Sequence, residues 1–231
     1  PQELNLASKN LGKSAWQSFL KIDFPLLKAS LGSAFIIVFV DVIKDGFLMD
    51  VSQITSLITL KTKAIAPVHL FGECADLLEI IKIAKQHSLF VIEDTAQAIG
   101  ASYTFADGRK QKVGTIGHVG TTSFFPSKNL GCYGDGGAIF TNDDELAHRI
   151  RGIVNHGMYT RYYHDVVGVN SRLDSIQAGV LKAKLPHLDT YCNARRTAAR
   201  FYNNAFSNNP NIITPTTKSN ATTHCKEICD I

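Results

Sequence analysis

The sequence predicts an α/β fold, built on a mainly parallel sheet that helices cover on both faces. Three largely apolar runs, at residues 34–40, 63–68 and 89–92, have the length of buried strands. Segments with helical spacing separate them, and a strand–helix–strand unit of this kind places its two strands parallel. Such strands are buried on both faces, which explains why the runs do not alternate with polar residues. A chain of 231 residues can bury a sizeable core, as one large domain or one and a half.

The first part of the chain becomes regular only after residue 33. Residues 1–33 show no clean hydrophobic period, and we assign them to a poorly readable remnant of an N-terminal part. The run 34–40 is the first expected strand. Residues 50–58 predict a short helix, because Asp50 is a favourable N-cap residue. The strand 63–68 follows.

The next helix and strand lead to the first candidate site residues. Residues 75–87 carry apolar side chains at helical spacing, at positions 77, 78, 80, 81, 83 and 84. This spacing predicts a helix with a wide buried face, followed by the strand 89–92. Ligands of parallel sheets bind beyond the carboxyl ends of the strands, where Asp94 and Gln97 stand three positions apart and can face one ligand. Alternatively Asp94 caps a helix, a role that still leaves one carboxylate oxygen for a ligand.

The remaining sequence predicts one further strand and three helices. They are expected, in order, at residues 138–141 (strand), 143–154, 172–185 and 189–206 (helices). Asp143 or Asp144 caps the first helix, and Pro186 stops the second. The segment 159–170 between these two helices is expected to be a loop rich in Tyr, His and Gly.

One lysine, Lys128, stands in a glycine-rich stretch, residues 117–137, between an aromatic pair and a loop with four glycines. Few charged residues surround it in the sequence, so its amine is easily desolvated and freed as a nucleophile. Amine nucleophiles form Schiff bases with carbonyl compounds, among them pyridoxal phosphate (PLP). The alternative, a solvated lysine on a glycine-rich turn, stays open at this point.

Charge and patterning argue against several classes of protein. The net charge is +4, but the basic residues are scattered apart from three arginines within 195–200, which argues against a nucleic-acid-binding protein. No apolar run approaches the length that spans a membrane. The first residues lack the features of a signal peptide, so we expect a cytoplasmic protein. His224, Cys225 and Cys229 fit no standard zinc spacing, and we expect no metal site.

Five motifs follow one another across roughly residues 35–206. They are Pro67-Val-His-Leu-Phe-Gly72, Glu93-Asp-Thr-Ala-Gln97, Ser123-Phe-Phe-Pro-Ser-Lys-Asn-Leu-Gly131, Gly134-Asp-Gly-Gly-Ala138 and Gly168-Val-Asn-Ser-Arg-Leu-Asp174. In this order they resemble the PLP-dependent sugar aminotransferases of the DegT/DnrJ/EryC1/StrS family, and together they are highly specific. The resemblance implies a PLP-dependent transferase of fold type I, aspartate aminotransferase-like, of which the chain holds the large domain in incomplete form.

The resemblance also implies roles for individual residues. Lys128 matches the lysine that forms a Schiff base with the cofactor and then moves a proton between substrate and cofactor. Asp94 matches the carboxylate that pairs with the pyridine nitrogen, Gln97 a residue near the ring hydroxyl, and Ser123 a hydroxyl donor to the phosphate. Asn170 matches an asparagine that reaches the phosphate of the neighbouring subunit's cofactor, which implies a homodimer with shared active sites.

The implied domain organisation and reaction follow from the same resemblance. Residues 34–188 form the PLP-binding large domain, and residues 189–231 form a linking helix and the truncated start of a small C-terminal domain. The implied reaction transfers an amino group, with glutamate as donor, to a nucleotide-linked keto-sugar, at the sugar 3-position. Its product serves amino-sugar biosynthesis, for a surface polysaccharide or a related compound.

Two other functions compete with this one. The family's glycine/threonine turn that cradles the cofactor phosphate is not recognisable within residues 1–33. The alternative is therefore a catalytically impaired fragment, or a non-catalytic chain that keeps the large-domain fold and the dimer surface. A nucleotide-binding Rossmann protein is excluded, because the sequence lacks the Gly-x-Gly-x-x-Gly motif that such proteins carry between a strand and a helix.

Overall fold

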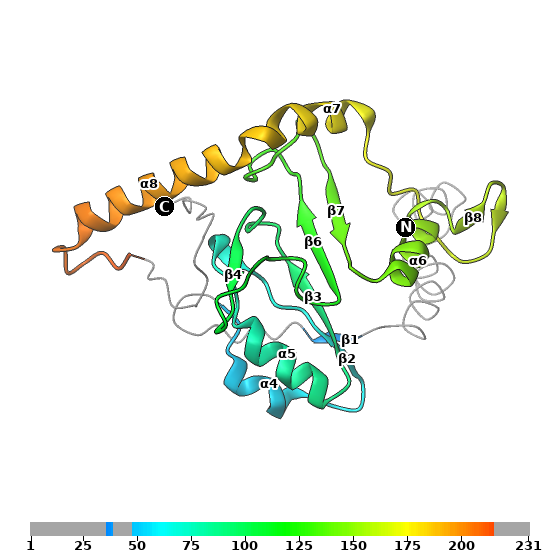
Figure 1. The fold of residues 1–231 in the computed structure, drawn as a ribbon, viewed down its shortest axis with the longest axis horizontal. Helices are drawn as coiled ribbons and strands as arrows, with labels where there is room; N and C mark the ends of the chain where they lie inside the picture. The colour runs from blue at the N-terminus through cyan, green and yellow to red at the C-terminus, as the bar shows by residue number, and fades with distance from the viewer. Residues whose placement is uncertain (1–35, 39–47, 215–231) are drawn as a thin grey trace, which may run out of the picture. The chain divides into compact units, whose positions relative to one another are not determined.

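A five-stranded sheet is the framework of the chain (Figure 1). The structure, a computed structural model, describes residues 36–38 and 48–214. The sheet has the order β1-β2-β3-β6-β7, with β1 (Ile36–Val38), β2 (Thr62–Ile65), β3 (Phe90–Asp94), β6 (Val119–Ser123) and β7 (Gly137–Phe140). β2, β3 and β6 run parallel, and β7 pairs antiparallel with β6. The predicted α/β fold with a mainly parallel sheet is confirmed.

Some expectations fall outside the described residues. They concern residues 1–33, part of the strand expected at 34–40, the residues His224, Cys225 and Cys229, and the rest of the segment 215–231.

Helices and two small hairpins complete the described part of the chain. The helices are α4 (Val51–Leu57), α5 (Leu77–Gln86), α6 (Asp144–Val154), α7 (Ser175–Lys184) and α8 (Leu188–Phe206), with the 3-10 helices η2 (Leu70–Gly72) and η3 (Leu185–His187). The antiparallel hairpins pair β4 (Ser102–Thr104) with β5 (Lys110–Lys112), and β8 (Met158–Thr160) with β9 (Tyr163–His164).

The helices α4 and α5 begin close to the predicted positions. Asp50 accepts a hydrogen bond from the Ser52 backbone N–H (3.1 Å), and Asp76 accepts one from the Glu79 backbone N–H (3.4 Å). The two helices and the strands β2 and β3 share one buried cluster, which comprises Ile54, Ile65, Ala75, Ile80, Ile83, Ala84, Leu89 and Val91. Burial of each larger side chain contributes about 1.5–3 kcal/mol. The buried face of α5 is narrower than predicted, because Leu78 is 51% exposed.

Helix α6 agrees with its sequence pattern at both ends. Asp143 caps it by accepting a hydrogen bond from the Leu146 N–H at 3.0 Å. After Val154 the chain turns, and His156 and Gly157 adopt positive φ angles of 61° and 76°. This left-handed conformation commonly ends helices.

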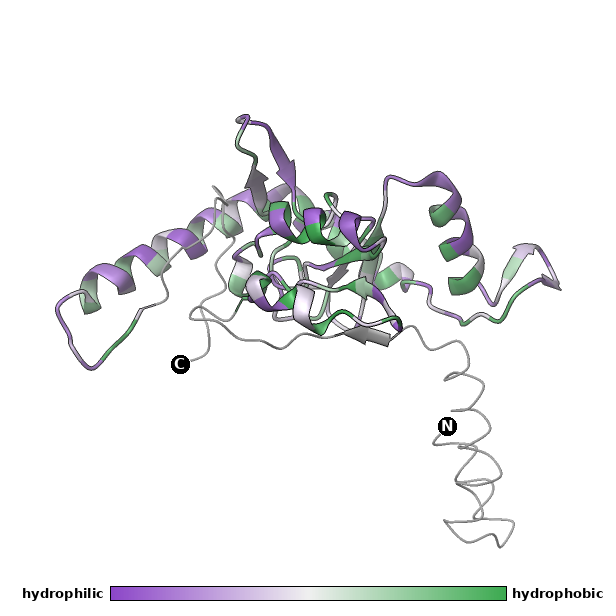
Figure 2. Ribbon diagram, turned by 90° about the horizontal axis from the view of Figure 1, so that it is seen from below, coloured by the Kyte–Doolittle hydropathy of each residue, from purple (hydrophilic) through white to green (hydrophobic). Residues whose placement is uncertain are grey.

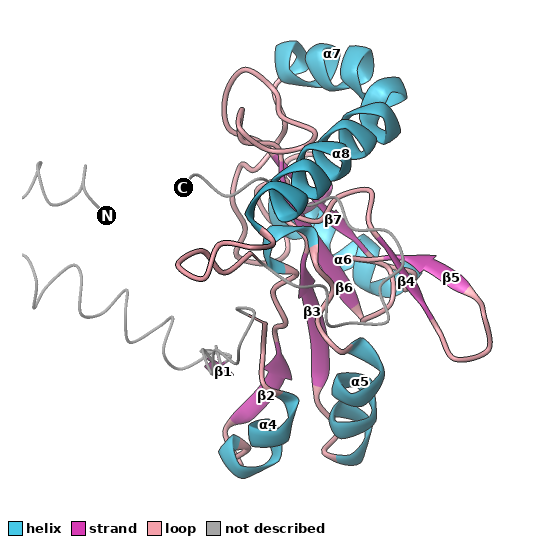
Figure 3. Ribbon diagram, turned by 90° about the vertical axis from the view of Figure 1, so that its left-hand side faces the viewer, coloured by secondary structure: helices cyan, strands magenta, loops and turns pink. Residues whose placement is uncertain are grey.

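The last two helices, α7 and α8, are joined by the single turn η3 (Figure 3). The sequence predicts a helix at 172–185 that stops at Pro186, but α7 begins only at Ser175 and Pro186 lies in the first turn of η3. Proline is tolerated there because a first turn needs no hydrogen bond from its nitrogen. Figure 2 shows polar and apolar residues alternating along the long helix α8. Within the described ranges, no helix has both the length and the apolar character of a membrane span.

The strand β6 is the main element that the sequence patterns did not predict. Its residues are mostly small and polar, Val-Gly-Thr-Thr-Ser, and lack the apolar run by which the strands of the sheet were predicted. β6 is nonetheless central, since it lies between β3 and β7 in the sheet. The loop expected at 159–170 is only partly present, because most of the β8–β9 hairpin lies in its first half, and residues 165–169 form no strand.

Candidate active site

The carboxyl ends of the parallel strands β3 and β6 lie at one edge of the sheet. In the register of this pair, Asp94 lies opposite Thr121, and Ser123 ends β6 two residues later. Val68, shortly after β2, forms a parallel bridge with Asp94. The structure therefore brings Asp94 and Ser123 to the same edge, which is where open α/β sheets bind their ligands.

Asp94 is the last residue of β3, and one of its carboxylate oxygens is used within its own loop. The Ala96 N–H donates a hydrogen bond to Asp94 Oδ1 at 2.9 Å, which closes a tight turn. The alternative role as a helix N-cap is wrong, because residues 96–100 form turns and no helix follows. Within the described residues no hydrogen bond reaches the second oxygen, Oδ2, so this oxygen is available to a ligand.

Two of the motifs that carry the family resemblance fold onto each other at this edge. The Asp94 N–H donates to the Pro67 carbonyl (2.9 Å), and the His69 N–H donates to the Asp94 carbonyl (3.0 Å). The Phe71 N–H donates to Gln97 Oε1 at 2.8 Å. This bond fixes which end of the Gln97 amide faces the protein and leaves its NH₂ group for another acceptor.

Next to the end of β3, His69 and Glu93 form a fully buried pair, with 3.1 Å between Nε2 and Oε2. Glu93 also accepts hydrogen bonds from the backbone N–H groups of Gly114 (2.7 Å), Ile116 (2.8 Å) and Gly117 (2.6 Å). Burial acts to raise the pKa of Glu93, but the hydrogen bonds from His69, Gly117 and Gly114 outweigh it and hold the pKa below its usual value. Glu93 is therefore ionised, and its hydrogen bonds connect β3 to His69 and to the segment 114–117.

Lys128 lies in a short closed loop between β6 and β7. The ends of this loop are joined, since the Cys132 N–H donates to the Phe124 carbonyl at 2.8 Å. Inside the loop, the Lys128 N–H donates to the Phe125 carbonyl at 2.9 Å. A Cβ atom at Gly131 would lie 2.4 Å from a backbone oxygen of the same loop, so the tight return requires glycine. These contacts restrict the backbone that carries the Lys128 side chain.

The Lys128 side chain is half-buried, and the described residues offer its Nζ atom no ion pair or hydrogen bond. Ser123 Oγ accepts a hydrogen bond from the Phe125 N–H (3.2 Å), so the hydroxyl can still donate its own proton elsewhere. No hydrogen bond recorded for this part of the chain joins Lys128 directly to Asp94 or Ser123. Asp94 and Ser123 are the last residues of the neighbouring strands β3 and β6, and Lys128 follows β6.

Asn170 lies apart from these residues, after the β8–β9 hairpin. Its backbone forms a bridge with Asn155, beside the end of α6. Its side chain is exposed, and its Oδ1 atom lies 3.5 Å from Nη2 of Arg172. Among the described contacts, none links Asn170 to Lys128 or Asp94 within one chain.

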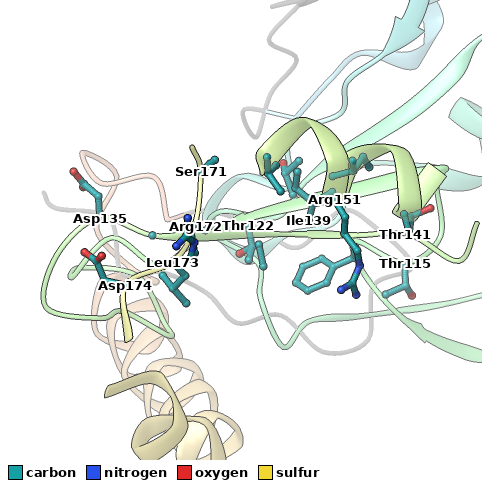
Figure 4. Close-up of a pocket in the computed structure, with 18 of the residues that line it drawn as sticks. Thr115, Thr122, Asp135, Ile139, Thr141, Arg151, Ser171, Arg172, Leu173 and Asp174 are labelled. Atoms are coloured by element: carbon teal, nitrogen blue, oxygen red, sulfur yellow. The ribbon is translucent and has the colours of Figure 1, made fainter. Parts of the chain in front are cut away.

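A cavity of about 970 Å³ lies elsewhere, between β7, α6 and residues 171–174 (Figure 4). Its charged side chains are Asp135, Arg151, Arg172 and Asp174. None of the five predicted site residues lines it. We therefore place the candidate site at the strand ends, where the carboxylate and the amine are found, and not in this cavity.

The groups that remain after these hydrogen bonds match the chemistry of PLP. Asp94 Oδ2 can accept a hydrogen bond from a protonated ring nitrogen. The Gln97 amide and the Ser123 hydroxyl can donate to anionic oxygens, such as those of a ring hydroxyl and a phosphate. Lys128 supplies the amine that an aldehyde needs. The residues present therefore fit a phosphorylated pyridine aldehyde.

Sequence reasoning missed two side chains of α7 that contact the end of the Lys128 loop. Gln177 Oε1 accepts a hydrogen bond from the Tyr133 N–H, and Lys184 Nζ donates one to the Gly131 carbonyl. Polar residues seven positions apart are also common on solvated helix faces, so the sequence carried no distinctive signal. Glu93 did carry a signal, since it is an acidic residue at the end of an apolar strand.

Known proteins resemble this chain in sequence and in fold. The sequence model of the DegT/DnrJ/EryC1/StrS aminotransferase family matches residues 29–229. The chain is 53% identical over 165 residues to a pleiotropic regulatory protein of Geobacillus stearothermophilus. It is 51% identical over 165 residues to UDP-N-acetyl-3-dehydro-α-D-glucosamine 3-aminotransferase of Acidithiobacillus ferrooxidans. Both matches cover 71% of this chain and 43% of the relative, so the chain spans less than half the length of these relatives.

Solved structures confirm the fold type. S. venezuelae DesV in complex with a ketimine intermediate superposes with a TM-score of 0.73 at 40% identity, over 79% of this chain and 47% of DesV. NtdA of Bacillus subtilis with bound cofactor PMP superposes with a TM-score of 0.71 at 30% identity, over 87% of this chain and 45% of NtdA. The sheet and helices described above are thus part of a fold-type-I transferase domain. The chain belongs to the DegT/DnrJ/EryC1/StrS aminotransferase family, which is PLP-dependent.

Proposed function

We propose that the chain, as part of an aminotransferase, moves an amino group from glutamate to a nucleotide-linked keto-sugar in amino-sugar biosynthesis. One observation carries the proposal. The amine of Lys128, which has no hydrogen bond or ion pair to the described residues, follows β6, and the neighbouring strand β3 ends in Asp94, whose Oδ2 accepts no hydrogen bond from them. PLP, when bound, supplies an aldehyde carbon that exchanges amino groups and a ring that takes up electrons.

Lys128 has two tasks in this proposal. Its Nζ atom is the nucleophile that attaches the cofactor, which requires the amine to face the ligand without a competing carboxylate. After an amino-acid substrate has displaced it, the same Nζ atom can accept a proton from the substrate and return it at a neighbouring carbon. The closed loop around Lys128 holds the amine for both tasks.

Asp94, Gln97 and Ser123 bind and orient. Asp94 Oδ2 favours the protonated ring nitrogen, and the hydrogen bond from the Ala96 N–H to Oδ1 sets the orientation of the carboxylate before a ligand arrives. The Phe71 N–H does the same for the Gln97 amide. Ser123 offers its hydroxyl proton to a phosphate oxygen.

The relatives support the class of substrate. The Acidithiobacillus ferrooxidans relative is named as a 3-aminotransferase acting on a UDP-linked sugar. We extend this to the present chain as a proposal: a nucleotide-linked 3-keto-sugar accepts the amino group. The cytoplasmic location and the glutamate donor expected above belong to the same proposal.

The proposal also includes the expected division of the chain into a large domain, 34–188, and a segment leading to a small domain, 189–231.

The proposal further includes a homodimer. Asn170 is exposed in the single chain, so its side chain is accessible to a neighbouring subunit. The hairpin before it exposes aromatic side chains, with Tyr162 76% and Tyr163 68% exposed. Aromatic residues of this kind are enriched at interfaces.

The direct test is covalent attachment of PLP to Lys128. The visible spectrum of the chain with PLP is recorded before and after borohydride reduction, for the wild type, Lys128→Ala and the exposed-lysine control Lys110→Ala. We expect a lysine-dependent band in the wild type and Lys110→Ala, and peptide mass analysis should locate the reduced cofactor on Lys128. Glutamate and nucleotide-linked keto-sugars are then tested as substrates.

Two results would contradict the proposal. The first is the absence of a band in the wild type, and the second is a band that survives Lys128→Ala. Either result would favour the alternative, a non-catalytic chain that keeps the large-domain fold.

A further inference from the structure

We propose that Gln177 and Lys184 are positioning residues that clamp the segment 131–134 and thereby fix the loop that carries Lys128. The inference rests on the proposed function, in which Lys128 is the nucleophile. Both side chains come from α7, and their contacts span 44 and 53 residues of sequence.

Gln177 holds one part of this segment. Its Oε1 atom accepts a hydrogen bond from the Tyr133 N–H at 2.8 Å. Its Nε2 atom lies so close to Gly134 that a Cβ atom there would be 3.0 Å away. The missing side chain at Gly134 therefore lets the amide reach the backbone of the loop.

Lys184 holds the other part. Its Nζ atom donates a hydrogen bond to the Gly131 carbonyl at 2.7 Å, and the contact is partly buried. A charged donor makes this hydrogen bond stronger than one between neutral groups. The same ammonium group lies 5.0 Å from the centre of the Tyr133 ring, within the range of a cation–π contact.

Between these two side chains, α7 also packs against the apolar side of the loop. Leu181 is buried and shares a cluster with Phe124, Leu130 and Cys132. Gln177, Leu181 and Lys184 are spaced at i, i+4 and i+7, which places them on one face of the helix. One helix face therefore contacts both the backbone and the side chains of the Lys128 loop.

The clamp matters because the loop is otherwise partly open to solvent. Phe125 is 50% exposed and Tyr133 is 77% exposed. Residues 125–127 of the loop are exposed, and exposed segments of this kind open locally at low cost in free energy. A nucleophile displaced by about 1 Å can lose roughly a hundredfold in rate, so the position of this loop bears directly on the chemistry of Lys128.

The test uses substitutions that remove the hydrogen bonds and keep the side-chain volume. Lys184→Met removes the donor and Gln177→Met removes the acceptor. Lys184→Arg and Gln177→Glu retain a donor and an acceptor, and serve as rescue variants. Lys182→Met is the matched control, because Lys182 is exposed and lies in the same last turn of α7.

Two readouts are measured on each variant. The first is amide hydrogen exchange of peptides covering residues 124–136, without PLP, with peptides of α5 as an internal standard of folding. The second is the rate at which PLP becomes fixed on Lys128 under borohydride. For both Met variants of the clamp we expect about tenfold faster exchange in the loop and about tenfold slower fixation. The rescue variants and Lys182→Met should behave like the wild type.

The outcomes separate the clamp from the proposed function. Unchanged exchange in the loop would overturn the clamp, and so would faster exchange that leaves the fixation rate unaltered. A wild type that never attaches PLP would reject the proposed function. In that case the loop exchange of the Met and rescue variants still decides whether α7 clamps the loop.

Discussion

The Nε2 atom of His69 lies 3.1 Å from Oε2 of Glu93, and both side chains are completely buried. The Ala75 N–H donates to the other ring nitrogen, Nδ1, at 3.1 Å, so Nδ1 is an acceptor and the proton sits on Nε2. His69 thus bridges the segment just before α5 and the end of β3. Since Asp94 is the next residue after Glu93, this pair helps to set the place of the candidate carboxylate.

The first prediction concerns the stability that this pair provides. Glu93→Gln replaces a carboxylate that accepts four hydrogen bonds with an amide whose NH₂ group faces backbone donors. We expect a loss of about 3 kcal/mol in the free energy of unfolding, because buried donors lose a charged partner. Urea denaturation measures the loss. Glu79→Gln is the control, since Glu79 is 41% exposed and forms only a surface ion pair with Lys82. Equal losses for both variants would contradict the anchoring role.

The second prediction follows from the direction of the Glu93 pKa. The pKa of Glu93 is lowered in the folded chain from an ordinary value of 4.5, so the unfolded chain binds a proton at this position first as the pH falls. The stabilisation is therefore complete above about pH 4.5 and is lost as the pH falls from there through the folded pKa. Urea denaturation midpoints are measured at several pH values from 7 down to the pH at which the chain unfolds without urea. The midpoint should fall with pH in the wild type, and it should fall less steeply in Glu93→Gln. Parallel curves for the two proteins would show that Glu93 is not the group responsible.

The order of elements from β1 to β3 could be predicted because long apolar runs and capping residues such as Asp50 mark them locally. β6 could not be predicted, since its small polar residues are a strand only through their pairing with β3 and β7. Ser123 lies at the carboxyl end of β6 because of this pairing, so its position could not be predicted from the sequence pattern.

In the candidate site too, residue types could be predicted from the sequence, but long-range contacts could not. Lys128 and Asp94 could be selected because their residue types and motifs suit the chemistry. The distant contacts of the site could not be predicted, because Gln97 accepts a hydrogen bond from a backbone N–H 26 residues away and Lys184 donates to a carbonyl 53 residues away. Such contacts depend on the complete fold, which single-sequence patterns do not contain.

The third prediction tests the tight return of the Lys128 loop with a pair of glycines. Gly131→Ala places a Cβ atom 2.4 Å from the Pro126 carbonyl oxygen, and backbone atoms must move to make room. We expect a loss of about 1–3 kcal/mol and slower attachment of PLP to Lys128. Gly179→Ala is the control, because nothing lies within 4 Å of its Cβ and α7 should gain about 0.5–1 kcal/mol. Thermal unfolding distinguishes the two, and a stable Gly131→Ala with normal attachment would contradict the prediction.

The fourth prediction concerns the charge on Asp94. Asp94→Asn keeps an oxygen for the Ala96 N–H but removes the negative charge that favours a protonated ring nitrogen. We expect PLP to bind about tenfold more weakly, or ~1.4 kcal/mol, with little change in the free energy of unfolding. PLP titration followed by absorbance measures the affinity. Asp107→Asn, at an exposed site beside Arg109, should leave it unchanged. Unaltered affinity in Asp94→Asn would remove Asp94 from the proposed cofactor site.

The fifth prediction concerns the proposed sharing of active sites between subunits. Lys128→Ala lacks the nucleophile, whereas Asn170→Ala keeps Lys128 but lacks the asparagine offered to its neighbour. A mixed dimer of the two variants contains one site with both residues and one with neither. Random mixing makes half of the dimers mixed, so about a quarter of the wild-type PLP attachment should return at low PLP concentration.

The control for this experiment is a variant that separates the subunits. Val167 is 96% exposed in the segment before Asn170, and a charge there should be costly if a partner covers it. When both chains also carry Val167→Glu, light scattering should report monomers and mixing should restore nothing. Leu60→Glu introduces the same charge at another fully exposed position, after α4, and should preserve both the dimer and the recovery. Recovery without dimers, or dimers without recovery, would show that Asn170 does not complete the neighbouring subunit's site.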